Sequence, residues 1–337
     1  MNKHILIIRL SSLGDVAMCV PVISVLRKNY PKLKITVLTT KFFSQLFNQV
    51  PDINFIFFEK KYKSLLGLWA FKNGLKKIKA DYIIDLHNVL RTKILDIFIN
   101  STPMYSVPFL KLDKARKEKK KIIKGGQLKR LKTMHQRYAD VFQKININLD
   151  LHKFSQYKKI NISKKNYNFL NSKKLVGIAP FAKHSCKEYS LENIIKVIDL
   201  LRSKVSVILF GAAGKEQRKL KDIAKNRENT FSIAGELTLK EEMDVISNLD
   251  LMISMDSANG HIAALFGINV VSIWGATHPF LGYAPFGQPE KNSILVDKKR
   301  YPKIPVSIYG SNCPKQYINA INSIKPEKIL DKINEII

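Results

Sequence analysis

The segment DLMISMDSANGHIAALFGINVVSIWG, residues 250–275, decides the fold class. Residues 250–255 form a short apolar run with the length of a buried strand, and residues 269–275 have the same character. Between them a helical pattern starts at His261, and Gly267 suits the C-terminal cap of that helix. A strand, a helix and a second strand in close succession predict a parallel sheet that is covered by helices.

The same alternation continues along most of the chain. Further strands are predicted at residues 4–10, 33–40, 53–59, 81–87, 173–180, 205–211 and 230–235. Further helices are predicted at residues 14–28, 41–50, 63–78, 90–99, 191–204, 215–226 and 325–337. One more helix begins at Thr238, which has capping-box spacing to Glu241. The pattern predicts two doubly wound α/β domains in tandem, joined near residues 150–170.

The alternating pattern lapses between residues 110 and 173. Residues 111–137 carry 12 Lys or Arg against two acidic residues. The first part of this basic segment, 110–137, is predicted to be a mobile loop, and the part up to Phe142 a helix. A nucleic-acid binder would interleave aromatic residues with such a run, and only Tyr138 lies at its edge, so nucleic acid is not an expected partner.

The overall charge is strongly positive. The chain has 337 residues, with 57 Lys and Arg against 27 Asp and Glu, a formal net charge of +30. Such a field favours anionic partners such as nucleic acid, anionic lipid or a phosphorylated sugar, although a Lys-rich proteome would also explain it. A hydrophobic content of 45% excludes disorder of the whole chain.

Cysteine content and the N-terminal residues indicate a cytoplasmic protein. Cys19, Cys186 and Cys313 are odd in number and lack metal-ligand spacing, so they are expected to be reduced thiols. Arg9 and Asp15 interrupt the N-terminal apolar run, which therefore does not read as a signal peptide. No run of about 18 apolar residues predicts a membrane-spanning helix.

Polar residues follow the strand at 250–255. Asp256 comes at its end, and the turn Ser257, Ala258, Asn259 and Gly260 offers backbone N–H groups at the start of a helix. Such a helix N-terminus binds anions, phosphate above all, and His261 in the first turn could donate to the same anion. The alternative is that Ser257 or Asn259 caps the helix and His261 packs.

Two further strand ends in the second half carry polar groups. Lys183, His184 and Lys187 follow the strand at 173–180, where cations could neutralise a diphosphate leaving group; a solvated loop is the alternative. Gly211 permits close backbone approach, and the carboxylate of Glu216 could accept ribose hydroxyls or could complement the helix dipole.

In the first half, Asp15 directly follows Gly14 at the start of a helix. Its carboxylate could deprotonate an acceptor hydroxyl, or it could act as a helix N-cap. No GxxxxGK[ST], GxSxG, HExxH or EF-hand pattern occurs, and no Asp-x-Asp pair suggests a metal-held diphosphate.

Taken in order, four segments resemble the bacterial heptosyltransferases of glycosyltransferase family nine, which have the GT-B fold. They are RLSSLGDVAMCVP, DYIIDLHNVLRTKIL, GIAPFAKHSCKEYS and LDLMISMDSANGHIAALFGINVVSIWG. The resemblance implies two Rossmann-like domains with a cleft between them. Residues 1–160 would bind the acceptor and residues 161–324 the nucleotide sugar, and residues 325–337 would form a terminal helix.

The resemblance also implies the reaction. It is an inverting, metal-independent transfer of heptose from ADP-heptose to the inner core of lipopolysaccharide, with no cofactor. Expected partners are the nucleotide-sugar donor, a phosphorylated glycolipid acceptor and the anionic inner-membrane surface, with the enzyme peripheral at the cytoplasmic face of that membrane.

Site residues follow from the matching motifs. The implied catalytic residues are Asp15 as base and Lys187 as the diphosphate-binding lysine. The implied nucleotide-sugar site comprises Lys183, Gly211, Glu216, Leu237, Asp256, Ser257, Ala258, Asn259, Gly260 and His261. The implied acceptor site comprises Ser12, Gly14 and Arg91, and no metal ligands are implied.

The sequence departs from the family pattern at two places. The turn after Asp256 reads Ser-Ala-Asn-Gly, where many members have Gly directly after the Ser or Thr, and Lys183 stands where some members have a hydroxyl residue. A GT-B transferase that uses another nucleotide sugar, a nucleotide-sugar epimerase, and a lapsed member that only holds lipid are the alternatives.

Overall fold

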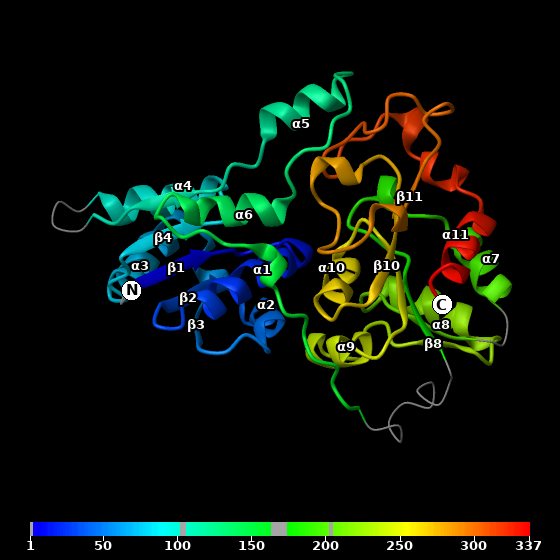
Figure 1. Cartoon of the computed structure of the whole chain (residues 1–337), viewed down its shortest axis with the longest axis horizontal. Helices are drawn as coiled ribbons and strands as arrows, with labels where there is room; N and C mark the ends of the chain where they lie inside the picture. The colour runs from blue at the N-terminus through cyan, green and yellow to red at the C-terminus, as the bar shows by residue number, and fades with distance from the viewer. Residues whose placement is uncertain (1–2, 102–105, 163–173, 202–204) are drawn as a thin grey trace. The chain divides into compact units, whose positions relative to one another are not determined.

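The computed structural model describes residues 3–101, 106–162, 174–201 and 205–337. They form two compact units, one of Met1–Lys114 with Met134–Ser155 and one of Ala115–Thr133 with Gln156–Ile337. Each unit holds one parallel sheet flanked by helices (Figure 1). The predicted architecture of two doubly wound α/β domains is thereby confirmed.

Five parallel strands form the sheet of the first unit, in the order β3-β2-β1-β4-β5. They are β1 (His4–Ile8), β2 (Lys34–Thr39), β3 (Ile53–Phe57), β4 (Tyr82–Asp85) and β5 (Phe109–Lys111). Every residue of β1 is buried, as a central strand covered on both faces requires. The chain reverses direction across the sheet between β1 and β4, which makes their carboxyl ends the place where such folds bind ligands.

Helices cover both faces of this sheet. They are α1 (Leu13–Asn29), α2 (Lys41–Ser44), α3 (Leu65–Lys76), α4 (Leu90–Asn100) and α6 (Met134–Gln143), with short 3-10 helices η1 (Gln45–Phe47), η2 (Lys60–Lys63) and η3 (Leu151–Lys153). α1 packs against α6, and α3 packs against α4. The inner sides of α3 and α4 share one hydrophobic core with β1 and β4.

The second unit repeats this topology with six parallel strands in the order β11-β10-β9-β6-β7-β8. They are β6 (Leu175–Ala179), β7 (Ser206–Leu209), β8 (Thr230–Ser232), β9 (Leu251–Met255), β10 (Asn269–Trp274) and β11 (Ser293–Leu295). Here the order reverses between β6 and β9, so their carboxyl ends define the corresponding ligand position.

The helices of the second unit include the predicted ones and one more. They are α5 (Arg116–Ile123), α7 (Leu191–Leu201), α8 (Lys215–Lys225), α9 (Leu239–Ile246), α10 (Ala258–Leu265) and α11 (Pro326–Asn334). The terminal helix α11 packs against α7. Parts of two predictions, Lys173 and residues 202–204, lie outside the described residues.

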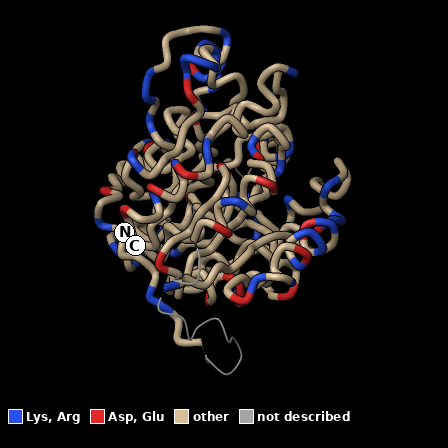
Figure 2. The backbone as a smooth tube through the Cα atoms, turned by 90° about the vertical axis from the view of Figure 1, so that its right-hand side faces the viewer, with Lys and Arg blue, Asp and Glu red and all other residues tan. Residues whose placement is uncertain are grey.

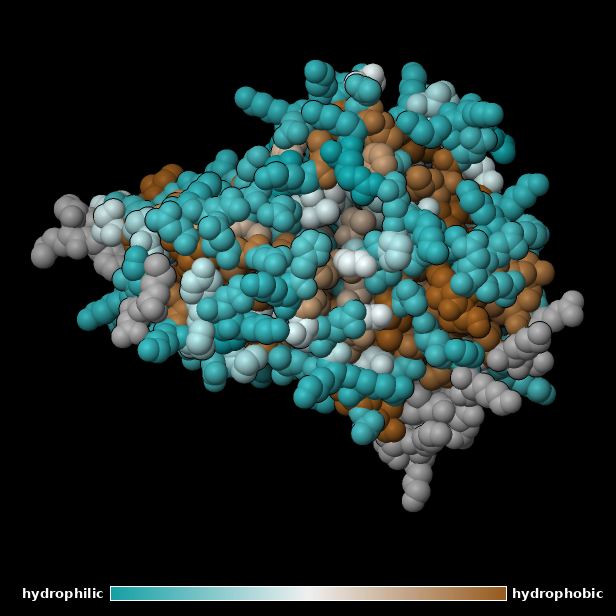
Figure 3. Space-filling view, viewed as in Figure 1, coloured by the Kyte–Doolittle hydropathy of each residue, from teal (hydrophilic) through white to brown (hydrophobic). Residues whose placement is uncertain are grey.

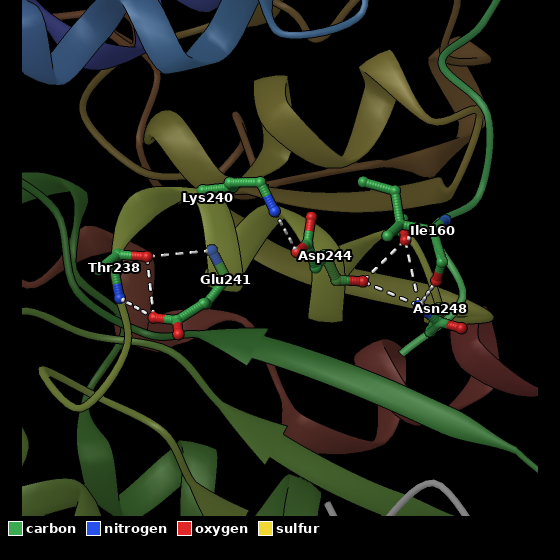
Figure 4. Close-up of polar contacts among 7 residues, drawn as sticks. Ile160, Thr238, Lys240, Glu241, Asp244 and Asn248 are labelled. Atoms are coloured by element: carbon green, nitrogen blue, oxygen red, sulfur yellow. Dashed lines mark hydrogen bonds and ion pairs between the residues drawn. The ribbon is translucent and has the colours of Figure 1, made fainter. Parts of the chain in front are cut away.

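The capping box predicted for α9 is confirmed (Figure 4). The Thr238 hydroxyl accepts a hydrogen bond from the backbone N–H of Glu241 at 3.3 Å, and the Glu241 carboxylate accepts one from the backbone N–H of Thr238 at 2.8 Å. Beyond the end of α9, the Asn248 side-chain amide donates to the Ile160 carbonyl at 2.9 Å. Thr238 and Glu241 therefore fix the start of α9, and Asn248, beyond its end, is tied to Ile160.

The prediction of a mobile loop in the first part of 110–137 is wrong. Phe109–Lys111 add the edge strand β5, and Arg116–Ile123 form α5. Ile122 and Leu131 bury their side chains with Leu281 in a small separate core, and this apolar anchor is what orders the segment. Ala115–Thr133 thus pack within the second unit, although the segment lies between two parts of the first in the sequence.

The start of α10 also differs from the prediction. The helix begins at Ala258 and not at His261, and Ser257 is its N-cap residue. Its predicted end is confirmed, because Gly267 has φ of +72° and its N–H donates to Ala264 while Ile268 donates to Ala263.

No helix within the described ranges is long and apolar enough to cross a membrane. The thiols of all three cysteines, Cys19, Cys186 and Cys313, are free.

Candidate active site

In the first unit, Arg9 joins the carboxyl ends of β1 and β4. Arg9 directly follows β1, and its side chain is only 4% exposed. One guanidinium nitrogen lies 2.7 Å from the Asp15 carboxylate, and the other donates at 2.5 Å to the carbonyl of Leu86, which follows β4. The guanidinium also lies over the ring of Tyr138 in α6. Arg9 is therefore a buried cation that fixes the position of Asp15.

Three groups, one from Arg9 and two from Ser12, contact the Asp15 carboxylate, which is still partly exposed to solvent. Ser12, the N-cap residue of α1, donates to the same carboxylate oxygen from its hydroxyl at 2.7 Å and from its backbone N–H at 3.2 Å. The Asp15 side chain is 27% exposed. The helix cap is thus Ser12, and Asp15 is the third residue of the helix.

The charge state of Asp15 follows from these contacts. Burial acts to raise the pKa of Asp15, but the charge of Arg9 and the hydrogen bonds from Ser12 outweigh it and hold the pKa below its usual range. The group is therefore an ionised carboxylate at neutral pH, oriented by its neighbours and able to accept a proton.

His87 and Asp85 complete the end of β4. The Asp85 carboxylate accepts hydrogen bonds from the backbone N–H groups of His87 and Asn88, which sets the turn into α4. His87 is buried, and its Nε2 lies 3.3 Å from the Ser11 hydroxyl. Burial and the charge of Arg9 lower the pKa of His87 to about 3, so its imidazole is neutral at physiological pH.

The predicted acceptor residues lie at two neighbouring helix starts. Ser12, Gly14 and Asp15 come together at the N-terminus of α1. Arg91 is in the first turn of α4, with its guanidinium over the ring of Phe58, and its charge also lowers the pKa of His87. Because β1 and β4 are adjacent and parallel, both helix starts lie at the same edge of the sheet.

In the second unit, three side chains from three strand ends converge. The Lys187 ammonium lies 3.0 Å from the Asp256 carboxylate, and the Thr277 hydroxyl donates to the same oxygen at 2.9 Å. Lys187 follows β6, Asp256 follows β9 and Thr277 follows β10. The Lys187 and Asp256 side chains are 13% and 12% exposed. The structure therefore brings together two of the predicted site residues, Lys187 and Asp256.

The backbone around Lys187 is fixed as well. Lys187 ends a short 3-10 helix, η5 (Ser185–Lys187), and the carbonyl of Cys186 accepts a hydrogen bond from Ala276 beyond β10. Gly310 has φ of +80°, and a Cβ there would lie 2.7 Å from Lys187 Cγ. A glycine is needed at 310 because the chain passes so closely over the lysine stem.

The N-terminus of α10 presents fewer donors than expected. Gly260 directs its N–H to the hydroxyl of Ser254 inside the fold at 3.2 Å, and that hydroxyl also lies 3.0 Å from Ser257 Oγ. The N–H groups of Ala258 and Asn259, the first two helical positions, have no partner within the helix itself. His261 is buried one turn further on.

The remaining predicted donor-site residues lie around neighbouring strand ends. Lys183 is exposed. Burial and the charges of Lys187 and Lys183 lower the pKa of His184, which is therefore not a third cation at neutral pH. Glu216 accepts a hydrogen bond from Ala212 at 2.8 Å and so closes the turn after β7.

Gly211 packs against α8, and Leu237 lies just before the start of α9. A Cβ at Gly211 would lie 2.9 Å from the side chain of Leu220 in α8, which keeps that position small. Leu237 is half-buried just before Thr238, the cap of α9. Among the described residues, no group of three or more His, Cys, Asp or Glu side chains is placed to hold a metal ion.

Sequence reasoning did not assign roles to Arg9, His87, Thr277 or Gly310. A usable signal existed for Thr277, since it follows a predicted strand next to the one that carries Asp256. Arg9 was noted only as an interruption of an apolar run, yet a charged residue at the end of a buried central strand needs a partner. Gly310 gave no signal, because its contact with Lys187 joins residues far apart in the sequence.

Comparison with known sequences identifies relatives of the whole chain. A model of "Glycosyltransferase family 9 (heptosyltransferase)" matches residues 68–304. The lipopolysaccharide core heptosyltransferase OpsX of Haemophilus influenzae is 24% identical, covering 94% of this chain and 87% of its own length. Lipopolysaccharide heptosyltransferase 3 of Escherichia coli is 25% identical over 84% of this chain and 85% of its own length.

Solved structures agree in fold. A glycosyl transferase family 9 protein from Veillonella parvula aligns with a TM-score of 0.76 at 18% identity, covering 99% of this chain and 97% of its own. The E. coli heptosyltransferase WaaC with ADP aligns with a TM-score of 0.67 at 16% identity, over 99% and 100% of the two chains. With a family model matching more than half of the sequence, the chain is a glycosyltransferase and belongs to glycosyltransferase family 9, the heptosyltransferases.

Proposed function

We propose that this enzyme transfers a heptose from ADP-heptose to the inner core of lipopolysaccharide. The observation that carries the proposal is the cluster of Lys187, Asp256 and Thr277 at the strand-order reversal of a family 9 fold. Relatives with lipopolysaccharide heptosyltransferase names support the acceptor. Solved relatives with ADP and with ADP-2-deoxy-2-fluoro heptose support the donor.

On the donor side, we assign the diphosphate to Lys187 and the start of α10. Displacement at an anomeric carbon passes through an oxocarbenium-like state while negative charge builds on the departing diphosphate. The Lys187 ammonium has three donors, and Asp256 takes one of them in the structure. Asp256 and Thr277 would hold the lysine in place, and the N–H groups of Ala258 and Asn259 would add fixed donors, so that no metal ion is needed.

On the acceptor side, we assign Asp15 as the base. It would accept the proton of the attacking hydroxyl as the new glycosidic bond forms on the face opposite the departing diphosphate, which inverts the anomeric centre. Its lowered pKa makes it a modest base, but it keeps the carboxylate ionised throughout the physiological range. Arg9 and Ser12 would hold it in the reactive orientation.

The positive charge of the chain fits an anionic acceptor at a membrane. Lys and Arg outnumber Asp and Glu along the backbone in Figure 2, and residues 111–137 are the densest run. We propose that Ala115–Thr133 attract the phosphate groups of the glycolipid, and that the enzyme works peripherally at the cytoplasmic face of the inner membrane. Each Lys or Arg near such a surface contributes about 1 kcal/mol.

The deciding experiment is product analysis with defined substrates. The purified enzyme is incubated with ADP-heptose and an inner-core glycolipid that lacks heptose, and the lipid product is analysed by mass spectrometry for the added sugar and by NMR for its anomeric configuration. Gain of one heptosyl residue with inverted anomeric configuration supports the proposal. A glycolipid that stays unchanged with ADP-heptose, but gains a sugar from another nucleotide sugar, refutes the heptose assignment while keeping the reaction class.

Calorimetry with free nucleotides identifies the donor base independently. ADP is expected to bind, and UDP, GDP and CMP are expected to bind much more weakly. Preferential binding of UDP would instead favour another nucleotide sugar. The epimerase alternative is not favoured, since the family to which the chain belongs is a transferase family.

A further inference from the structure

An apolar patch lies on the outer surface of α3 and α4 in the first unit. Leu65, Leu66 and Trp69 on α3 are 62%, 84% and 50% exposed, and Leu90 and Ile97 on α4 are 74% and 64% exposed. Isolated exposed apolar residues are common on protein surfaces, but a contiguous group marks a surface that contacts something else. We call these five residues the α3–α4 patch.

The patch is continuous across the two helices. Leu65 and Trp69 are four residues apart, and Leu90 and Ile97 are seven apart, so each pair lies along one side of its helix. The rings of Trp69 and Phe98 meet edge to face at 5.1 Å between centroids and join the two helices. In Figure 3, hydrophobic side chains interrupt the hydrophilic surface over α4.

Positive charge surrounds this patch. Residues 59–79 and 89–101 contain nine Lys or Arg and two acids. Both acids, Glu59 and Asp96, already pair with lysines. The ammonium of Lys72 lies over the Trp69 ring, 2.8 Å from its centroid. An apolar centre with a tryptophan and a lysine rim is the composition of surfaces that rest in the headgroup region of an anionic bilayer.

The position of the patch suits a membrane acceptor. α3 and α4 follow β3 and β4, so their first turns lie at the carboxyl edge of the sheet, where Asp15 also lies. Leu65, Leu66 and Leu90 are in those first turns. A bilayer against the patch would therefore be next to the edge at which we place the acceptor hydroxyl.

We infer that the α3–α4 patch docks the enzyme onto an anionic lipid bilayer. The inference rests on the proposed function only in that the acceptor is a membrane glycolipid. A second copy of this chain is a poor occupant, because it would bring the same positive rim against this one. Phosphatidylglycerol headgroups complement the rim, and the outer acyl region accepts Leu66, Trp69 and Ile97.

Tryptophan fluorescence tests the inference directly. The chain has two tryptophans, and Trp274 is buried in β10, so Trp69 is the exposed one. On addition of phosphatidylglycerol and phosphatidylethanolamine vesicles, we expect a blue shift, and quenching by lipids brominated on their acyl chains. Trp69→Phe, which keeps Trp274, should lose both signals. Co-sedimentation of the wild type with vesicles without any change in emission would overturn the inference.

A substitution pair gives the second, independent readout. In Leu66→Ser/Ile97→Ser, we expect vesicle partitioning to fall by about tenfold or more, because two exposed aliphatic side chains no longer enter the bilayer. Phe42→Ser is the matched control: Phe42 is 51% exposed on α2, which right-handed connections place on the other face of the sheet. Equal partitioning of the double variant and the wild type refutes the docking surface.

Two further measurements separate this inference from other outcomes. Heptose transfer to a water-soluble, lipid-free core oligosaccharide should be unchanged in the double variant, since none of the substituted residues is assigned to the reaction. If the wild type partitions through the patch but transfers no heptose, the proposed function fails and the docking surface stands. If sedimentation velocity finds a dimer that the double variant dissociates, the patch is a subunit interface and the inference is wrong.

Discussion

Each unit places a cation beside a carboxylate at the carboxyl edge of its sheet, but the exposure of the two partners differs between the units. In the first unit, Arg9 is 4% exposed and its partner Asp15 is 27% exposed, so a buried cation presents an acid. In the second unit, the side chains of Lys187 and Asp256 are 13% and 12% exposed, so the two ions are buried to the same degree. In both, a hydroxyl, of Ser12 or Thr277, donates to the same carboxylate oxygen as the cation.

The difference follows from where each residue stands after its strand. Arg9 and Asp256 directly follow β1 and β9, where the chain is still inside the sheet layer. Asp15 and Lys187 come several residues later, on a helix turn beyond the strand end. In the first unit both partners follow the same strand, β1, and the later one is the more exposed. In the second unit the partners follow different strands, β6 and β9, and are equally exposed. Under the proposed function, Asp15 of the first pair is the base and Lys187 of the second pair binds the diphosphate.

The largest expected effect is that of Asp15→Asn. Removal of the base should lower the transfer rate by about 10²–10⁴-fold, because proton transfer from the acceptor hydroxyl is lost. ADP affinity, measured by calorimetry, should stay at the wild-type value, since we assign the nucleotide to the other unit. Asp81→Asn is the control: Asp81 also accepts a backbone hydrogen bond, but at the amino end of β1. Full transfer activity in Asp15→Asn would show that Asp15 is not the base.

The next largest effect is expected for Lys187→Met. Loss of the Lys187 ammonium should lower kcat/KM by about 10²–10³-fold and weaken ADP binding, because the diphosphate charge is no longer matched. Lys240→Met is the matched control, since Lys240 also pairs with an aspartate, Asp244 at 3.1 Å, but on the exposed side of α9. If both variants weaken ADP binding equally, the loss comes from the lower positive charge of the whole protein and not from a specific binding site.

Arg9→Met should change the pH dependence more than the maximal rate. The pKa of Asp15 is lowered in the wild type by Arg9 against the opposing effect of burial, so removing Arg9 raises it. Transfer needs the ionised carboxylate, and the acid limb of the kcat/KM profile should therefore shift to higher pH. The stability contributed by the ionised Asp15, present above its unfolded pKa and lost as pH falls through the folded pKa, should shrink as well. An acid limb that does not move would show that Asp15 is not the titrating group.

The smallest effects are expected for the two hydroxyl donors. Ser12→Ala and Thr277→Val each remove one hydrogen bond to a carboxylate that keeps its cation, a loss of about 1 kcal/mol, or roughly fivefold in kcat/KM. Ser12→Ala should act on the transfer rate alone, and Thr277→Val on ADP affinity as well. Steady-state kinetics combined with ADP titration distinguishes these patterns, and identical patterns would argue against separate roles for the units.

Most strands and helices could be predicted because their signals are local, but the three-residue edge strands β5 and β11 were not predicted. The continuous apolar run of β1 and the capping box of Thr238 and Glu241 each lie within a few residues. The start of α10 was predicted three residues late, because Ser257–Gly260 read as a turn and the apolar pattern starts only at His261. α5 was missed because its ordering depends on Leu281, more than a hundred residues away.

The candidate site also contains residues that the local sequence predicts and contacts that it does not. Asp15, Lys187 and Asp256 could be proposed from motifs, since each stands in a recognisable strand-end segment. Their partners are harder to propose. The positions of Arg9 and Thr277 at strand ends carry a signal, but which side chain each one meets, and the close approach of Gly310 to Lys187, depend on contacts that the folded chain makes.

The sequence by itself was enough for the α/β class, most of the strands and helices and the family, since these depend on local hydrophobic periodicity and on contiguous motifs. Only the tertiary structure decided which charges meet. A buried ion needs a partner at hydrogen-bond distance, and the parallel sheets bring together the ends of strands that are distant in the chain. Arg9 therefore reaches Leu86 as well as its near neighbour Asp15, and Lys187 faces Asp256 beside Thr277, contacts that join residues far apart in the sequence in every case but Arg9 with Asp15.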